Sequence, residues 1–281
     1  MFYCILYINV EGFNLLKITK LEVQKKNKER LNLFINNEFE MGIDQATYIY
    51  FNSRKDMEVT KEQLQKIKDY DQYRQALNQA IIYLSHKKRT ELEVEQYLTD
   101  KEYSYDLVKD VIDYCKNNRY INHEDYIESL KNTILKTTDK GPDHFERVAK
   151  EKGLSNDLIL KYKSKFEEEM SDDRIINIAN KIMSKKKQPP NRLKQSIVQT
   201  LQQRGYAFSL INEHLTDLNI EPTSDDVENI LMKDLEKVYN KYQKKYNGYE
   251  LKTHVVQALA RKGYTFDMIN DKLRESGIVD E

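Results

Sequence analysis

The sequence predicts a mainly α-helical protein, in which tandem three-helix repeats form an elongated, solenoid-like stack behind a small N-terminal module that contains β-strands. Three observations predict this fold class. Residues 193–215 and 251–273 are identical at 11 of 23 positions, with a constant offset of 58. Weaker copies of the same pattern lie upstream, and before residue 60 the apolar residues alternate instead of following a helical spacing. Repeats of this size are typical of stacked helical units, none of which buries its apolar face alone.

The N-terminal part of the chain predicts an extension followed by a small sheet. Residues 1–16 are apolar, but they lack a basic leading segment and are too short to span a bilayer. We interpret them as an extension that precedes the true start, and an extra strand is the alternative. Residues 17–70 are assigned to a small β/α module. Apolar residues alternate there in three short runs, which predicts antiparallel strands, and Thr60 with Gln63 predicts a capping box that opens a short helix.

Four repeats follow, and each is expected to hold three helices. The last two copies read as a helix, a glycine stop and a helix, and a further amphipathic stretch precedes each copy. Leu201, Phe208 and Ile211 recur at helical spacing in the last two copies and are expected in the core. Gly263 is expected to end its helix with a positive φ. The repeats are assigned to residues 71–122, 123–170, 171–221 and 222–281, and their first helices to residues 71–85, 123–137, 172–185 and 225–246.

Composition limits the class of protein. The chain has 46 basic and 46 acidic residues, so attraction to a polyanion must come from local clusters. Cys4 and Cys115 are too few for a disulfide scaffold, which favours a reducing compartment, and we expect the cytoplasm. The 5 histidines are scattered without metal-ligand spacing, and no P-loop, GxSxG or GxGxxG motif occurs. The sequence therefore predicts a protein that is not an enzyme, with no catalytic residue, metal or cofactor.

The candidate binding site is a set of basic residues in the link between the first and second helices of every repeat. Equivalent links in a stack lie along one edge, and each precedes a helix N-terminus whose unpaired N–H groups favour an anion. We therefore predict a basic edge that binds phosphates or an acidic groove. The alternative is that exposed links are rich in lysine for solubility and cap the first helices. The predicted edge comprises Lys87, Lys88, Arg89, Lys140, Lys185, Lys186, Lys187, Lys244 and Lys245.

Two other sets of residues are interpreted as structural. Arg204 and Arg261 precede the glycines, where a cation complements a helix C-terminus. Tyr103, Tyr206 and Tyr264 follow the turns directly. Although tyrosines can stack on nucleic-acid bases, this position is that of the apolar contact that closes a helix C-terminus. Neither set is predicted to contact a ligand.

Several short motifs together resemble the RecX family of RecA regulators, most of all its longer members. They are Lys87-Lys-Arg-Thr-Glu-Leu-Glu-Val94 with Tyr97-Leu98, Tyr120-Ile-Asn-His-Glu-Asp-Tyr126 with Ser129-Leu130, Lys140-Gly141-Pro142 and Lys262-Gly-Tyr264, and the resemblance runs from about residue 17 to the end. It implies a repeat protein that binds in the helical groove of the RecA filament on single-stranded DNA. Such a protein blocks filament extension or promotes disassembly, and so limits recombination and the SOS response.

Two further hypotheses stay open beside this resemblance. A repeat protein could bind DNA directly through the basic edge, and strong salt dependence of binding to naked DNA would favour that reading. A protein-only scaffold would be indifferent to both DNA and the filament. The expected partners are the RecA filament and single-stranded DNA, with double-stranded DNA as an additional candidate. We expect no membrane partner and a monomer.

Overall fold

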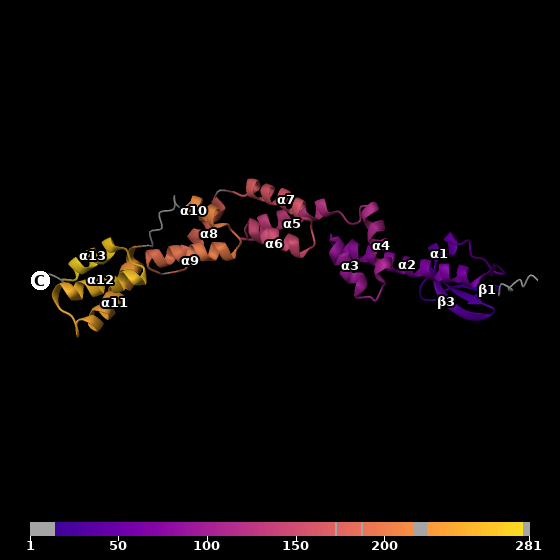
Figure 1. Ribbon diagram of the computed structural model, residues 1–281, viewed down its shortest axis with the longest axis horizontal. Helices are drawn as coiled ribbons and strands as arrows, with labels where there is room; N and C mark the ends of the chain where they lie inside the picture. Colours follow the sequence, from indigo (N-terminus) through magenta and orange to yellow (C-terminus); the bar gives the residue numbers. More distant parts are fainter. Residues whose placement is uncertain (1–14, 172, 187, 216–223, 278–281) are drawn as a thin grey trace, which may run out of the picture. The chain divides into compact units, whose positions relative to one another are not determined.

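The structure is a computed structural model that describes residues 15–171, 173–186, 188–215 and 224–277 (Figure 1). The chain divides into two compact units, Met1–Tyr126 and Ile127–Glu281. The described residues hold 4 strands, all in the first unit, and 13 helices. This confirms the predicted helical class with an N-terminal β-containing module. Most of the predicted extension, residues 1–14, lies outside the described residues.

The N-terminal sheet has four antiparallel strands in the order β3-β2-β1-β4. Alternate residues of the strands face the core, where Ile18, Leu33 and Ile43 are fully buried. The three longer strands confirm those predicted from alternation, whereas the short fourth strand and helix α1 (Gln45–Tyr50) have too few residues to give a periodic signal. The strands are β1 (Leu16–Val23), β2 (Arg30–Ile35), β3 (Glu38–Asp44) and β4 (Glu58–Val59).

A single long helix, α2 (Lys61–His86), connects the sheet to the first helix triplet. It begins at Thr60 with the predicted capping box to Gln63. Leu64 belongs to the core of the sheet, and Leu77 belongs to the core of the triplet. The short helix expected before residue 71 and the first helix of the repeat are therefore one continuous helix. No glycine or proline interrupts this segment, so nothing in the backbone ends the helix there.

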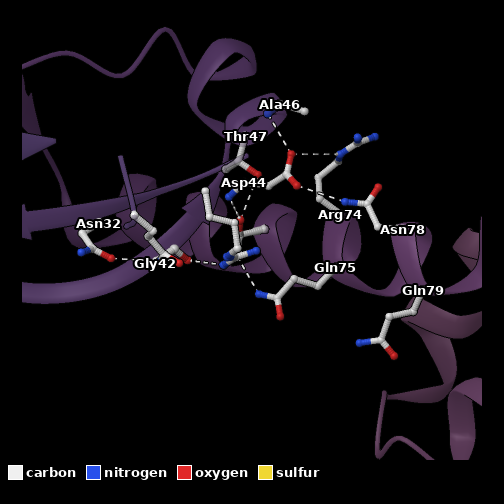
Figure 2. A network of polar contacts seen from close by, with 12 residues as sticks. Asn32, Gly42, Asp44, Ala46, Thr47, Arg74, Gln75, Asn78 and Gln79 are labelled. Carbon is white, nitrogen blue, oxygen red and sulfur yellow. Dashed lines mark hydrogen bonds and ion pairs between the residues drawn. The ribbon is translucent and has the colours of Figure 1, made fainter. Parts of the chain in front are cut away.

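A buried polar network attaches the sheet to α2, and Figure 2 shows it from close by. Asp71 of α2 is 0% exposed and pairs with Arg30 of β2 at 3.0 Å. Its carboxylate also accepts hydrogen bonds from the backbone N–H of Asp44 (2.5 Å) and from the hydroxyl of Thr47 (3.2 Å). The Asp44 carboxylate accepts a further bond from the side-chain amide of Asn78 (3.0 Å). These contacts fix β2, the end of β3 and α1 on one side of α2.

Four helix triplets make up the rest of the described chain. The first helices of the last three begin at residues 123, 173 and 224, against the predicted 123, 172 and 225. The triplets are α2, α3 (Glu91–Thr99) and α4 (Tyr105–Asn117); α5 (His123–Thr137), α6 (Pro142–Glu151) and α7 (Asn156–Glu169); α8 (Asp173–Met183), α9 (Pro190–Gln203) and α10 (Phe208–Leu215); and α11 (Ser224–Tyr242), α12 (Gly248–Lys262) and α13 (Phe266–Glu275).

The tyrosines after the turns pack as the sequence predicted. Tyr206 and Tyr264 are both 2% exposed. Their hydroxyl groups also have partners, because Tyr206 accepts a bond from Arg174 (2.9 Å) and Tyr264 donates to Asp234 (3.0 Å). Tyr103 is partly buried against the core of the first triplet. Each ring thus closes the end of a second helix over its own triplet.

Glycines end the second helices of the last two triplets, as predicted. Gly263 has a φ of 103° and Gly205 a φ of 87°, in a region that residues with a Cβ rarely adopt. Both turns also lie against the second helix of the preceding triplet. A Cβ on Gly263 would be 3.1 Å from the backbone nitrogen of Arg192, and one on Gly205 would overlap the backbone of His144. Glycine is therefore required twice, by its dihedral angle and by the close approach of another chain segment.

Candidate basic site

The predicted basic residues all fall in links between first and second helices where the structure describes them. The links lie between α2 and α3, α5 and α6, α8 and α9, and α11 and α12. Lys187 lies outside the described residues. The exposed members of the set are Lys87, Lys88, Lys185, Lys186, Lys244 and Lys245, whereas Arg89 and Lys140 are partly buried.

Two of the cations in the first link already have partners. The Nζ of Lys88 is 2.6 Å from the carboxylate of Asp125. The guanidinium of Arg89 lies over the ring of Tyr83, 4.0 Å from its centroid, and 3.9 Å from Glu93. Only 16% of the Arg89 side chain is exposed, so its cation–π contact and ion pair give it a packing role within the triplet.

The link between α5 and α6 is held in place by Arg174 of α8. The Arg174 guanidinium donates hydrogen bonds to the carbonyl oxygens of Leu135 (2.7 Å), Lys140 (3.1 Å) and Thr138. A planar guanidinium with five N–H donors suits this role, because one side chain satisfies several carbonyl groups at the end of a helix. The backbone that carries Lys140 is thus fixed from the next triplet.

At α6 and α9, several N–H groups of the helix N-termini beside these links already have partners. The N–H of Gly141 donates to the carbonyl oxygen of Arg204 (2.8 Å), and that of Asp143 donates to Gly205 (2.9 Å). At α9 the N–H of Asn191 donates to Gly263 (3.1 Å). The expectation that these N–H groups are unpaired was therefore wrong, because carbonyl groups of the next glycine turn lie against them. The lysine side chains are the groups at these two links that remain able to contact an anion directly.

A groove of about 720 Å³ in the second unit gathers further cations, outside the predicted basic edge. It is lined by α9, α10 and the C-terminal end of α12. Arg192, Lys194 and Arg261 supply positive charge, Gln199 is one of several amide side chains, and the ring of Phe208 is half exposed. No carboxylate lines the groove within the described residues. Cations, amide groups and an aromatic ring are the groups that bind phosphates and stack on bases in single strands.

Phe208 belongs to a set of exposed aromatic residues at the start of third helices. Tyr105, Phe208 and Phe266 begin α4, α10 and α13 and are 73%, 56% and 63% exposed, whereas α7 begins with Asn156. The expectation that Phe208 and its counterpart Phe266 lie in the core was wrong. The sequence signal for their exposure is a pair of aromatic residues two positions apart after the turn in the first, third and fourth triplets. The first residue of each pair already closes the core, so the second is free to face outward.

Reactive groups are few in the described residues. Burial raises the pKa of the Cys115 thiol to about 11, which keeps it protonated near neutral pH and therefore a poor nucleophile. Among the described side chains, no group of three or more His, Cys, Asp or Glu is placed to hold a metal ion. A membrane-crossing helix, which must be long and apolar, is not found in this part of the chain. The surfaces described above offer binding groups: cations, amides and aromatic rings.

Comparison with known proteins identifies the family. The regulatory protein RecX N-terminal domain matches residues 16–60, the first three-helix domain of RecX matches residues 76–115, and its third three-helix domain matches residues 226–273. Regulatory protein RecX of Staphylococcus saprophyticus is 47% identical over 264 residues, which cover 94% of this chain and 97% of that protein. The chain belongs to the RecX family. RecX of Staphylococcus carnosus is 46% identical over 265 residues, with 94% and 99% covered.

Solved RecX structures have the same fold. A crystal structure of regulatory protein RecX aligns with a TM-score of 0.63 and 25% identity, covering 71% of this chain and 100% of that one. RecX from Lactobacillus salivarius aligns with a TM-score of 0.51 and 23% identity, covering 54% and 99%. The first and third RecX domains fall on α2–α4 and α11–α13. The described chain has two triplets between them, one more than the RecX numbering implies.

Proposed function

We propose that this RecX-family protein binds the RecA filament on single-stranded DNA and inhibits the extension and activities of that filament in recombination and the SOS response. The observation that carries the proposal is the recurrence of exposed lysines in equivalent links of three triplets: Lys87, Lys185 and Lys244. A nucleoprotein filament presents a repeating surface of protein and phosphate. A repeat protein meets such a surface with several weak contacts, each strengthened because the others tether it. We place this activity in the cytoplasm and assign it to a monomer.

The RecX-family membership supports the regulatory part of this proposal, because the relatives bear that name. The basic links support the choice of a partner that carries phosphate. Their lysines are exposed and flexible, which suits point contacts with a charged backbone more than recognition of one sequence.

Direct binding to single-stranded DNA is the second candidate, and the groove beside Phe208 favours it. Arg192, Lys194 and Arg261 line that groove together with the exposed ring. Stacking of a base on Phe208 and pairing of phosphates with the cations would bind a strand without RecA. A protein-only scaffold uses neither the groove nor the lysines.

The test adds the protein to preformed RecA filaments and follows ATP hydrolysis and strand exchange across a salt series. The variant Lys185→Gln/Lys186→Gln/Lys244→Gln/Lys245→Gln removes four exposed lysines of the links. We expect weaker inhibition, and a salt dependence of log affinity that falls by about 0.7 for each lost phosphate contact. Thermal unfolding should hardly change, because exposed lysines add little to stability.

The matched control removes four exposed lysines of the sheet module, Lys25→Gln/Lys26→Gln/Lys28→Gln/Lys61→Gln. Inhibition by this control should equal that of the parent. If both variants inhibit as the parent does, the lysines of the links contact only solvent and the proposal fails. Equal binding of the parent to naked single strands and to filaments would select direct DNA binding, and no effect on either would select the scaffold.

A further inference from the structure

A pocket of about 770 Å³ in the first unit has a lining unlike that of the basic links. It lies between the end of α1, the middle of α2 and the first turns of α4. Four aromatic rings line it, from Tyr50, Phe51, Tyr70 and Tyr73. Because all of these elements belong to the first unit, the pocket is complete within that unit.

The rings are packed on one another and still face solvent. Tyr50 and Tyr70 are stacked, with centroids 4.3 Å apart and planes 12° apart, and Phe51 meets Tyr70 edge-on at 5.6 Å. Tyr50 is nevertheless 67% exposed. The stack fixes the rings in place before any partner arrives, so the ring faces that stay uncovered are available at little cost in side-chain entropy. Phe51, Tyr70 and Tyr73 are only partly buried, and grouped aromatic rings that reach the surface are typical of binding sites.

The pocket is acidic as well as aromatic. Asp69, Asp106 and Asp110 line it, against a single cation, Lys66. Asp69 accepts a hydrogen bond from Gln65 (2.7 Å), and none of the three carboxylates has an ion pair within the described part of the chain. Asp106 sits in the first turn of α4, where an acid also complements the helix dipole. Asp110 lies one turn further along, where that explanation no longer applies.

We propose that this pocket binds an arginine side chain presented by a basic segment of a partner protein. The planar guanidinium is weakly hydrated, stacks on aromatic faces and pairs with carboxylates, so the lining matches it in both shape and charge. The same carboxylates repel a phosphate backbone. The pocket and the basic links therefore select opposite chemistry: this face contacts protein, and the links contact an anion. The inference rests on the lining of the pocket and not on the proposed function.

The probe is a short peptide that alternates arginine and glycine, titrated into the full chain and followed by amide chemical shifts. We expect the largest shifts at Tyr50, Tyr70, Asp106 and Asp110, and affinity that falls as salt is added. Versions of the same peptide with lysine or glutamate in place of arginine separate the contribution of charge from that of stacking by the planar guanidinium. Lysine should bind more weakly because an ammonium does not stack as a plane, and glutamate should not bind at the pocket.

Two variants test the pocket itself. Asp106→Asn/Asp110→Asn should weaken binding of the arginine peptide by about tenfold if each lost charge contributes about threefold, as exposed ion pairs do. Tyr50→Ala removes one exposed ring and should weaken binding by roughly two- to fivefold, the range for an exposed cation–π contact. Because Tyr50 and both aspartates are exposed, the fold should remain, which the unchanged shifts of distant amides would confirm.

The matched control is Glu167→Gln/Glu168→Gln, which removes two exposed carboxylates from α7 in the second unit. It should bind the peptide as the parent does. The proposal is overturned if the control weakens binding as much as the pocket pair, if the shifts fall outside the pocket, or if no binding is seen at millimolar peptide. Equal binding of lysine and arginine peptides, with Tyr50→Ala unaffected, would also overturn it, since bulk charge would then explain the attraction.

Discussion

Within each of the two units of this RecX-family chain, the elements are joined by different chemistry. In the first, a buried carboxylate, Asp71, joins the sheet to α2 through Arg30 and two hydrogen-bond donors. In the second, consecutive triplets meet through the Arg174 guanidinium and through glycine turns, as where the N–H of Asp143 donates to the carbonyl oxygen of Gly205. The contact in the first unit depends on a buried carboxylate, and the turn contacts in the second depend on the absence of a side chain at the glycine. Removing a buried charge and adding a side chain at a turn should therefore test the two units separately.

The buried charges of the two units show the same contrast. Lys131 of α5 is 1% exposed, nearly as buried as Asp71. Its partners, Glu128 (3.0 Å) and Glu169, have side chains that are 39% and 47% exposed, so water can still reach them. The partners of Asp71 include a backbone N–H and a hydroxyl that are themselves buried. The cost of losing a buried charge should follow the burial of its partners more than its own.

The largest effect is expected from Asp71→Ala. The substitution leaves the guanidinium of Arg30 without its carboxylate and the buried N–H of Asp44 without its acceptor, and breaking a buried pair in this way costs about 3–5 kcal/mol. Hydrogen exchange of the amides of α1 measures it, because α1 is held by this network. Asp69→Ala on the same helix is the control, since Asp69 is exposed and should cost far less. A loss below about 1 kcal/mol would mean that the network is not what joins sheet and helix.

The next largest effect is expected from Gly205→Val. A β-branched residue at positive φ is strained by about 1–2 kcal/mol, and overpacking against the backbone of His144 adds about 1–3 kcal/mol. Denaturant unfolding of the series Gly205→Val, Gly263→Val and Gly248→Val separates the two contributions. Gly248 also has a positive φ, of 52°, but no atom lies within 4 Å of its Cβ position, so only the strain remains. Equal losses at all three positions would show that the contact between triplets contributes nothing.

Most of the fold could be predicted because local spacing encodes it. The glycine, tyrosine and apolar positions of the repeated segments define the turns, the positive φ of Gly263 and the burial of Tyr264. Short elements were not predicted, because the six residues of α1 complete too few turns to show a periodic pattern of apolar residues. The exposure of Phe208 was also not predicted, since helical spacing does not show that the first residue of a helix lies beyond the core.

The candidate site was predicted only in its position along the chain. The links hold the lysines, but the contacts that engage them come from residues distant in sequence. Lys88 pairs with Asp125, 37 residues away, and the N–H of Asp143 bonds to a turn in the next triplet. Contacts between residues that are far apart in the chain produce no periodic pattern in a single sequence, so they could not be predicted from it. The groove beside Phe208 and the pocket beside Tyr70 are likewise made by separate helices that meet only in the fold.

A smaller effect is expected from pH in the first unit. The Nε2 of His123 accepts a hydrogen bond from the backbone N–H of Glu91 (3.2 Å), which only the neutral ring can do. Burial lowers the pKa of His123 below its ordinary 6.5, and nearby Lys116 lowers it further against the opposing charge of Glu91. A lowered pKa stabilises the fold above pH 6.5, and this contribution is lost as the pH falls through the folded value. We expect exchange of the Glu91 amide to speed up between pH 7.5 and 5.5, after correction for intrinsic rates.

The variant His123→Gln keeps an acceptor and cannot titrate, so this pH dependence should disappear. His86→Gln, at an exposed position of α2, is the control and should keep it. The amide of Glu91 is the required readout, because burial also lowers the pKa of His144 in the second unit and would contribute to global unfolding. If His123→Gln keeps the same pH dependence, titration of His123 does not control the hydrogen bond to the Glu91 amide.

The smallest effect is expected from Lys131→Met. Methionine fills a similar volume, and removing the buried ammonium also removes the cost of taking that charge out of water. The carboxylates left behind are half exposed, so they regain water, and unfolding free energy should change by no more than about 1 kcal/mol. A second readout shows that the pair was present in the parent: its hydrogen bond lowers the pKa of Glu128, which should rise in the variant. A loss as large as that of Asp71→Ala would mean that the burial of the charge itself, and not of its partners, sets the cost in both units.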